Sequence, residues 1–138
     1  MSIATIDRNL YFPLKKAIRE HIKKINFRPI KQILFTFDPF HHSVNSTRQF
    51  LYHISSHKVH RTNPLCRLKT NIVNDRSDPS VAFTLANGEN VVIKSSNFSL
   101  IELFELYQKY IAVHDVAPTT DSKALATTGK GKPSKGRK

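Results

Sequence analysis

Residues 28–56 read R-P-I-K-Q-I-L-F-T-F-D-P-F-H-H-S-V-N-S-T-R-Q-F-L-Y-H-I-S-S, and this stretch decides the fold. It begins with a strand, expected at residues 31–38, whose side chains are mostly apolar on both faces. A strand of that kind usually lies in the middle of its sheet. The strand stops at Pro39 and passes directly into an amphipathic helix, expected at residues 45–57.

Local sequence signals mark the start of the helix expected at residues 45–57 and the point where the helical pattern stops. Ser46, followed by Gln49 three residues later, fits a capping box, and Asn63-Pro64 breaks the pattern. The apolar stripe of the helix consists of Phe50, Leu51 and Ile54. We expect the helix to cross one face of the sheet and lead into a second strand, parallel to the first, by a right-handed connection.

The second strand is expected at residues 65–73, where side chains alternate in character. The inward side chains would be Cys66, Leu68 and Ile72, and the outward ones Arg67, Lys69 and Asn71. This alternation predicts a half-buried strand with a basic outer face. A turn cluster follows at residues 75–79.

Residues 80–85 and 89–95 predict a hairpin around Asn87-Gly88. A two-residue loop would put the apolar residues of the two strands on opposite faces. A three-residue loop, with Gly88 in the left-handed region, shifts the register by one residue and brings them onto one face. These apolar residues are Val81, Phe83, Leu85, Val91 and Ile93. Because register follows the buried face, we expect the three-residue loop with a glycine bulge.

The last helix is expected at residues 100–113. Ser99 and Glu102 make a second capping box, and Phe98 can staple onto Leu103. The buried stripe of this helix consists of Leu100, Leu103, Phe104, Tyr107 and Ile111. Pro118 marks the limit of the helix, and the Thr, Gly, Lys and Pro residues beyond it predict a disordered tail.

The element order predicts an α/β domain with a mixed four-stranded sheet: strand, helix, strand, then a hairpin and a helix. This layout is thioredoxin-like, without the middle helix of that fold. We divide the chain into a basic N-terminal helix at residues 1–27, a core domain at 28–116 and a basic flexible tail at 117–138.

The N-terminal helix has two interpretations. Its apolar stripe consists of Leu10, Leu14, Ile18, Ile22 and Ile25, and basic side chains decorate the rest. A basic, amphipathic, acid-poor N-terminus is typical of a mitochondrial targeting segment. It is equally typical of a helix that packs on its own domain, and both interpretations hold if the segment is not cleaved.

The positive charge is concentrated at the two ends of the chain. The formal net charge is +12, and residues 117–138 hold six Lys or Arg against one acidic residue. Residues 28–116 hold ten against seven. Basic arms around a nearly balanced domain predict a polyanionic partner, with nucleic acid first and an anionic membrane surface second. A tail that merely improves solubility is the competing interpretation.

The residue inventory excludes several chemistries. No cysteine lies where the first strand meets the helix, which is where a thioredoxin-type enzyme needs its thiolate. Cys66, the single cysteine, is expected to be an apolar filler in the core. His53 and His57 are one helical turn apart and His60 follows, but no cysteine pair or glutamate completes a zinc site. We predict no enzyme activity, no metal, no cofactor, no small-molecule substrate and no membrane span.

Several short motifs resemble one known family. They are Phe37-x-Pro39-Phe40, Ser46-Thr47-Arg48, Ser55-Ser56, Thr62-Asn63 and Asn97-Phe98-Ser99-Leu100. Ordered over residues 28–113, they resemble the mitochondrial large-subunit ribosomal protein family numbered fifty-three. The resemblance implies a thioredoxin-like, non-catalytic protein of the mitochondrial matrix. It implies contacts with rRNA and neighbouring mitochondrial ribosomal proteins near the stalk base of the large subunit.

Candidate contacts with the rRNA backbone or with partner proteins are basic residues of the core and the tail. They are Lys31, Arg48, Lys58, Arg61, Arg67, Lys69, Lys130, Lys132, Lys135, Arg137 and Lys138. The sequence contains no aromatic-rich stacking motif of the kind that an RNA-recognition sheet carries, so backbone and shape contacts are expected. The alternative function is an accessory subunit of a respiratory complex on the same fold, whose basic ends would meet acidic proteins or lipid. A thiol enzyme is opposed by the missing cysteine pair.

Overall fold

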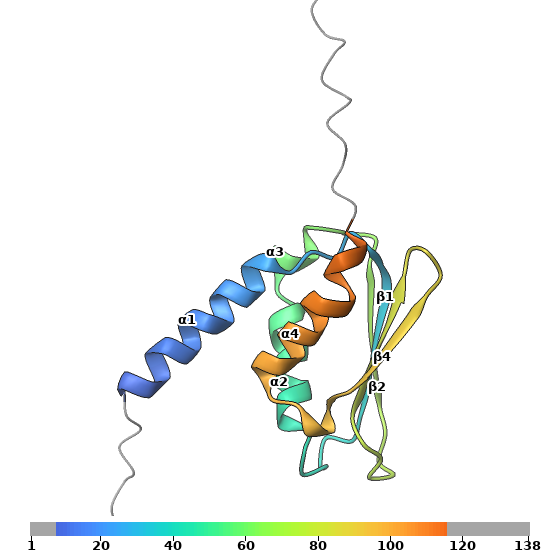
Figure 1. The fold of residues 1–138 in the computed structure, drawn as a ribbon. Coiled ribbons are helices and arrows are strands. Elements are labelled where there is room, and N and C mark those ends of the chain that lie inside the picture. Colours follow the sequence, from blue (N-terminus) through green and yellow to red (C-terminus); the bar gives the residue numbers. More distant parts are fainter. Residues whose placement is uncertain (1–7, 116–138) are drawn as a thin grey trace, which may run out of the picture.

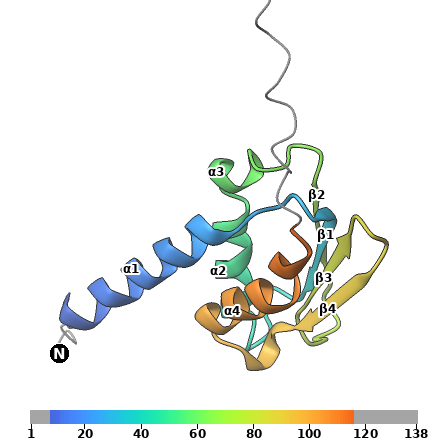
Figure 2. The ribbon, with the colours of Figure 1, turned by 45° about the horizontal axis from the view of Figure 1, so that its top comes forward.

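The computed structural model describes residues 8–115, which form a two-layer α/β domain with an additional N-terminal helix (Figure 1). The elements in chain order are α1 (Arg8–Lys24), β1 (Ile30–Phe37), α2 (Asn45–Ile54), α3 (His57–His60), β2 (Arg67–Ile72), β3 (Ser80–Leu85), β4 (Asn90–Lys94), η1 (Ser95–Asn97), α4 (Leu100–Tyr110) and η2 (Ala112–His114). Helices α2 and α4 lie side by side on one face of the sheet, and α1 crosses near their ends (Figures 1 and 2).

The sheet is mixed and has four strands in the order β2-β1-β3-β4. Strand β1 is central, as its apolar composition predicts, and it pairs in parallel with β2 and antiparallel with β3. The parallel pair follows from the crossover through α2 and α3, because a tight turn can join only antiparallel strands. The mixed α/β fold is thus confirmed and is compatible with the thioredoxin-like layout.

The hairpin has the predicted three-residue loop. The N–H of Leu85 donates to the carbonyl of Glu89 across residues 86–88, and Phe83 pairs with Val91. Gly88 has a φ of 93°, a conformation that costs glycine little and other residues much. This register places the apolar side chains of both strands on one face, toward the helices.

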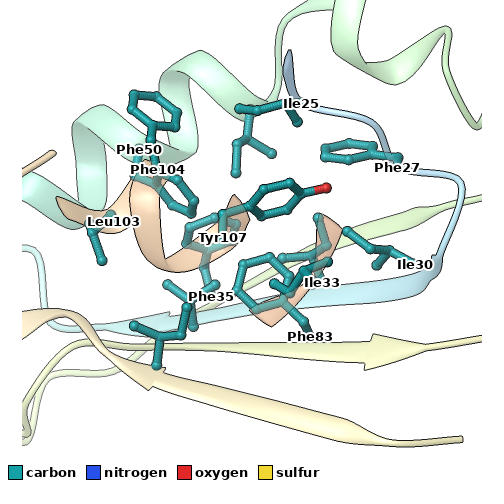
Figure 3. Close-up of a cluster of buried hydrophobic side chains, with 14 of the residues drawn as sticks. Ile25, Phe27, Ile30, Ile33, Phe35, Phe50, Phe83, Leu103, Phe104 and Tyr107 are labelled. Carbon is teal, nitrogen blue, oxygen red and sulfur yellow. The ribbon is translucent and has the colours of Figure 1, made fainter. Parts of the chain in front are cut away.

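One apolar core fills the space between the sheet and the helices (Figure 3). Phe35, Phe50, Phe83 and Phe104 are almost completely buried there. Tyr107 lies among them and donates its hydroxyl proton to the carbonyl oxygen of Asn26, with 2.6 Å between the oxygen atoms. This hydrogen bond satisfies the one polar atom of a buried ring, and the desolvation raises the pKa of Tyr107 well above its usual range.

The segment between α1 and β1 is tied to the core. Ile25 and Phe27 belong to the buried cluster. The N–H of Phe27 donates to Oγ1 of Thr62, and the side-chain amide of Asn63 donates to the carbonyls of Phe27 and Ile30. The loop after α3 therefore fixes the segment that follows α1 against the domain.

The prediction of a helix at residues 45–57 is wrong at the C-terminal end. Helix α2 stops at Ile54, and Ser56 adopts an extended conformation with φ −63° and ψ 143° before the short α3 begins. Val59 of α3 is buried. In one continuous helix Val59 would lie about 140° around the axis from Ile54, so the break allows both side chains to reach the same core.

The capping box predicted at Ser46 is also wrong, whereas the one at Ser99 is confirmed. The N-cap of α2 is Val44, with no side-chain cap, and Ser46 lies inside the first turn. At α4, the Ser99 side chain accepts from the N–H of Glu102 while the Glu102 carboxylate accepts from the N–H of Ser99. The last helix is shorter than predicted and ends at Tyr110.

The prediction that Ile72 points into the core is wrong. Ile72 is 65% exposed, although its neighbour in the register, Phe37, is 7% exposed. Strand β2 lies at the edge of the sheet, and both residues stand at the end of their strands. The helical layer covers the central strands and leaves this corner open.

Candidate nucleic-acid interface

The second face of the sheet carries no helix in the described part of the chain (Figures 1 and 2). All the helices pack on the face that holds the apolar side chains of β1 and β3. On the opposite face the strands carry mainly polar, small and basic residues. This uncovered face is therefore a broad surface that a partner can reach.

The register arranges the uncovered face in three rows that run across the strands. Paired residues of neighbouring strands point to the same face. In the order β2-β1-β3-β4 the rows are Arg67, Gln32, Thr84 and Asn90; then Lys69, Leu34, Ala82 and Val92; then Asn71, Thr36, Ser80 and Lys94. These twelve residues are named the open face below.

The open face is basic at both edges and has no acidic residue. Arg67 and Lys69 are exposed on β2 and stand about 7 Å apart, two residues along one strand. Lys94 is exposed on β4, three strand spacings across the sheet and one row from Lys69 or two rows from Arg67, which places it about 16 Å from Lys69 and about 20 Å from Arg67. Such an arrangement favours an extended anion that spans the sheet over a single bound ion.

The middle of the open face suits contact with a backbone. Hydroxyl and amide groups of Gln32, Thr36, Ser80 and Thr84 lie between the basic edges, and such groups donate to phosphate and ribose oxygens. None of the twelve residues is aromatic, so the face has no platform on which a base could stack. The surface can contact a polyanion without reading its sequence.

The predicted contact residues do not all gather on this face. Arg67 and Lys69 belong to it. Lys31 is exposed at a register irregularity of β1 between Ile30 and Gln32. Arg48 is exposed on α2, on the helical side of the domain.

Two further predicted contacts lie around α3. Lys58 is exposed on α3, and Arg61 is exposed at its C-cap. The tail residues Lys130, Lys132, Lys135, Arg137 and Lys138 lie outside the described residues. The basic residues of residues 8–115 thus form more than one surface.

Lys94 is a member of the open face that the sequence analysis missed. The signal is present in the alternation of Asn90, Val92 and Lys94 with the inward Val91 and Ile93. It becomes informative only after the strand order shows that β4 shares a sheet with β2. Two lysines on opposite edges of a sheet cannot be related from their spacing in the sequence.

At the junction of β1 and α2, where a thiol enzyme would have its nucleophile, Asp38 has a structural role. Its carboxylate is 1% exposed and accepts from the N–H of Phe40 at 2.9 Å and from the N–H of Arg76 at 3.1 Å. The Arg76 guanidinium lies 3.6 Å from the same carboxylate, and Arg76 has a φ of 58°. The carboxylate thus ties the loop before β3 to the end of β1.

Cys66 is a free thiol that is buried in the core. Burial raises its pKa to about 11, so the nucleophilic thiolate is scarce at neutral pH. The ring of His53 lies near Phe104, and burial lowers its pKa. Within residues 8–115 no three His, Cys, Asp or Glu side chains come together in a way that could hold a metal ion.

A family comparison bears on this fold and surface. The sequence model of the family described as 39S ribosomal protein L53/MRP-L53 matches residues 37–88 of the chain. This segment belongs to that family. The L53 family is a family of mitochondrial ribosomal proteins of the large subunit, in agreement with the resemblance found in the sequence.

The L53 match runs from the end of β1 through α2, α3, β2 and β3 to the hairpin loop. It therefore includes Asp38 and both basic residues of β2, Arg67 and Lys69. It does not include α1, α4 or the C-terminal tail. None of the helices of residues 8–115 is both long enough and apolar enough to cross a bilayer.

Proposed function

We propose that this chain is a structural, non-catalytic constituent of the mitochondrial large ribosomal subunit and works in the mitochondrial matrix. The observation that carries the proposal is the L53 match over residues 37–88. The buried, weakly acidic Cys66 and the structural role of Asp38 agree with a scaffold that does not catalyse a reaction.

The rRNA backbone is the proposed ligand of the open face. Arg67, Lys69 and Lys94 provide charge at both edges, and hydroxyl and amide groups fill the middle. Contacts of this kind neutralise phosphates and release counterions, so their affinity falls steeply with salt. The basic tail, with six Lys or Arg in residues 117–138, would add contacts of the same kind.

Neighbouring ribosomal proteins are the second class of proposed partner. The resemblance to the L53 family implies a position near the stalk base. Arg48, Lys58 and Arg61 lie away from the open face and are free to contact another component when the open face lies on RNA. A protein held between RNA and other proteins needs two such separate surfaces.

Sedimentation of a mitochondrial lysate tests this function. The chain is detected by antibody across a sucrose gradient, with and without ribonuclease. We expect it to migrate with the large subunit and to leave that position after nuclease treatment. Migration with a membrane complex, insensitive to nuclease, would overturn the proposal and support the respiratory accessory subunit.

A further inference from the structure

A groove lies on the helical side of the domain, away from the open face. It encloses about 780 Å³ between α1, α2, α3 and the start of α4. The apolar lining consists of Leu14, Ile18, Ile22, Tyr52 and Leu100. Tyr52 is 74% exposed and Leu14 is 44% exposed, so the groove leaves large apolar surface in water.

Helix α1 forms one wall of the groove and extends beyond the body of the domain. Its C-terminal half packs on the core through Ile18 and Ile22. Its N-terminal half projects past α2 and α4 in both views (Figures 1 and 2), and Phe12 there is 79% exposed. An apolar helix face without a partner is a surface that another amphipathic element can cover.

The charged residues that line the groove are all basic. Arg19 on α1 and Lys58 on α3 line it, together with Lys15, and no Asp or Glu does. Arg19 and Lys58 are exposed, and neither forms an ion pair within residues 8–115. An occupant that brings carboxylates to the edges of the groove would gain from both cations.

The apolar lining and the positive charge together limit which molecules could bind in the groove. A phosphate backbone would satisfy Arg19 and Lys58 but would leave Tyr52 and Leu14 uncovered. A second copy of the chain would bring more positive charge, because the formal net charge is +12. The C-terminal tail, with six basic residues against one acidic residue, would be repelled in the same way.

We propose that this groove binds an acidic amphipathic helix of a partner protein. The apolar stripe of that helix would cover Leu14, Ile18 and Tyr52, and its flanking Glu or Asp residues would face Arg19 and Lys58. From Leu14 to Ile22 the wall is about 12 Å long, which corresponds to roughly two turns of a bound helix. This is the helix-in-groove mode of recognition, with anchors at i, i+3 or i+4, and i+7.

The proposal does not depend on the ribosomal role and is tested with the purified full-length chain. The probe is a fluorescent synthetic helix of about 14 residues, stapled because free helices of this length are marginal in water. It carries Leu on one stripe and Glu on both flanks. We expect it to bind with a Kd below about 100 μM, and a scrambled peptide of the same composition to bind at least about tenfold more weakly.

Groove variants and matched controls locate the binding. Tyr52→Ser, and separately Arg19→Glu with Lys58→Glu, should each weaken binding of the probe by about tenfold or more. Tyr110→Ser is the control for the lost ring, because Tyr110 is 47% exposed on α4 and does not line the groove. Lys16→Glu with Lys23→Glu is the control for charge on α1, and these lysines do not line the groove either. Both controls should bind the probe within about twofold of the unmodified chain.

Four outcomes would overturn the proposal. The first is no binding of the acidic helix, and the second is equal binding of the scrambled peptide. The third is an equal loss in the control variants, which would indicate attraction by net charge alone. The fourth is that a short RNA duplex, or vesicles of phosphatidylcholine with phosphatidylserine, lose affinity for the groove variants while the peptide does not. Circular dichroism confirms the folding of each variant before binding is measured.

Discussion

The two faces of the sheet differ in how deeply their side chains are buried. On the covered face, Phe35, Val81 and Phe83 are fully buried under the helices. On the open face the matching positions hold Leu34, Ala82 and Thr84, and Val92 is 61% exposed. The same strands therefore contribute core packing through one set of residues and a partner surface through the alternate set.

The difference teaches that stability and function can be separated in this domain. A side chain on the covered face is surrounded by other side chains, so a change in its volume alters the free energy of unfolding. A side chain on the open face has water on one side, so its replacement alters mainly what the surface can bind. Each prediction below tests this separation, and the effects decrease from the first to the last.

Truncation of the covered face should have the largest effect. Phe83 is 0% exposed, and its ring lies 5.8 Å from that of Tyr107. Phe83→Ala should lower the free energy of unfolding by about 3–5 kcal/mol, since it removes buried area and leaves a cavity. Urea denaturation followed by circular dichroism measures the change. A loss below about 1 kcal/mol would show that this part of the core is loosely packed.

The reactivity of Cys66 should differ strongly between the folded and unfolded chain. Its pKa is raised to about 11, so at pH 8 the folded thiol should form roughly 100-fold less thiolate than an unfolded one. Because the folded pKa is the higher one, this burial contributes stability below pH 9, and the contribution is lost as the pH rises toward 11. The rates of alkylation by iodoacetamide, measured in buffer and in urea, give the ratio of Cys66 reactivity in the folded and unfolded chain. Equal rates would place the thiol at the surface.

Loss of the Asp38 charge should have an intermediate effect. Asp38→Asn removes the charge that faces Arg76 and turns one acceptor oxygen into a donor group. We expect the free energy of unfolding to fall by about 1–3 kcal/mol. Hydrogen exchange should show the loss at residues 75–79 first. Asp75→Asn is the control, because Asp75 is exposed, and it should cost less than about 0.5 kcal/mol.

Charge reversal on the open face should have the smallest effect on stability. Arg67→Glu, Lys69→Glu and Lys94→Glu together should change the free energy of unfolding by no more than about 0.5 kcal/mol per site. Chemical denaturation measures the change. A much larger loss would mean that the open face contributes to the fold and is not a separate surface.

The sequence correctly predicted the features that follow from the alternation of apolar and polar side chains. The central position of β1, the parallel β1–β2 pair and the register of the hairpin follow from which residues must be buried. The capping box at Ser99 was predicted because its two partners are local. Where the physical signal lies within a few residues, the sequence is sufficient.

The errors have two kinds of cause: the turn that directly precedes α2, and contacts between parts of the chain that are distant in sequence. The N-terminus of α2 is set by the turn at residues 38–44, in which His41 accepts from the N–H of Ser43 and the carbonyl of Val44 accepts from Arg48. With Val44 as the N-cap of α2, Ser46 lies inside the first turn and cannot be the cap. The break after Ile54 depends on the burial of Val59, and the exposure of Ile72 depends on where the helical layer ends.

The candidate surfaces were only partly predictable for the same reason. Arg67 and Lys69 could be paired from their alternation on one strand. Lys94 joins them only through the strand order β2-β1-β3-β4. Lys58 and Arg19, which line one groove, are on helices that the sequence gives no reason to place together.

The most direct test of the account is the occupancy of the large subunit by the open-face variant. Cells depleted of the endogenous chain express tagged protein carrying Arg67→Glu, Lys69→Glu and Lys94→Glu, or the control Lys16→Glu, Lys23→Glu and Arg28→Glu, which makes the same change in net charge. Large subunits from sucrose gradients are then assayed for the tag. We predict that the open-face variant is lost from the subunit, increasingly so at high salt, while the control is retained. Equal retention of both variants at every salt concentration would contradict the assignment of the open face to rRNA.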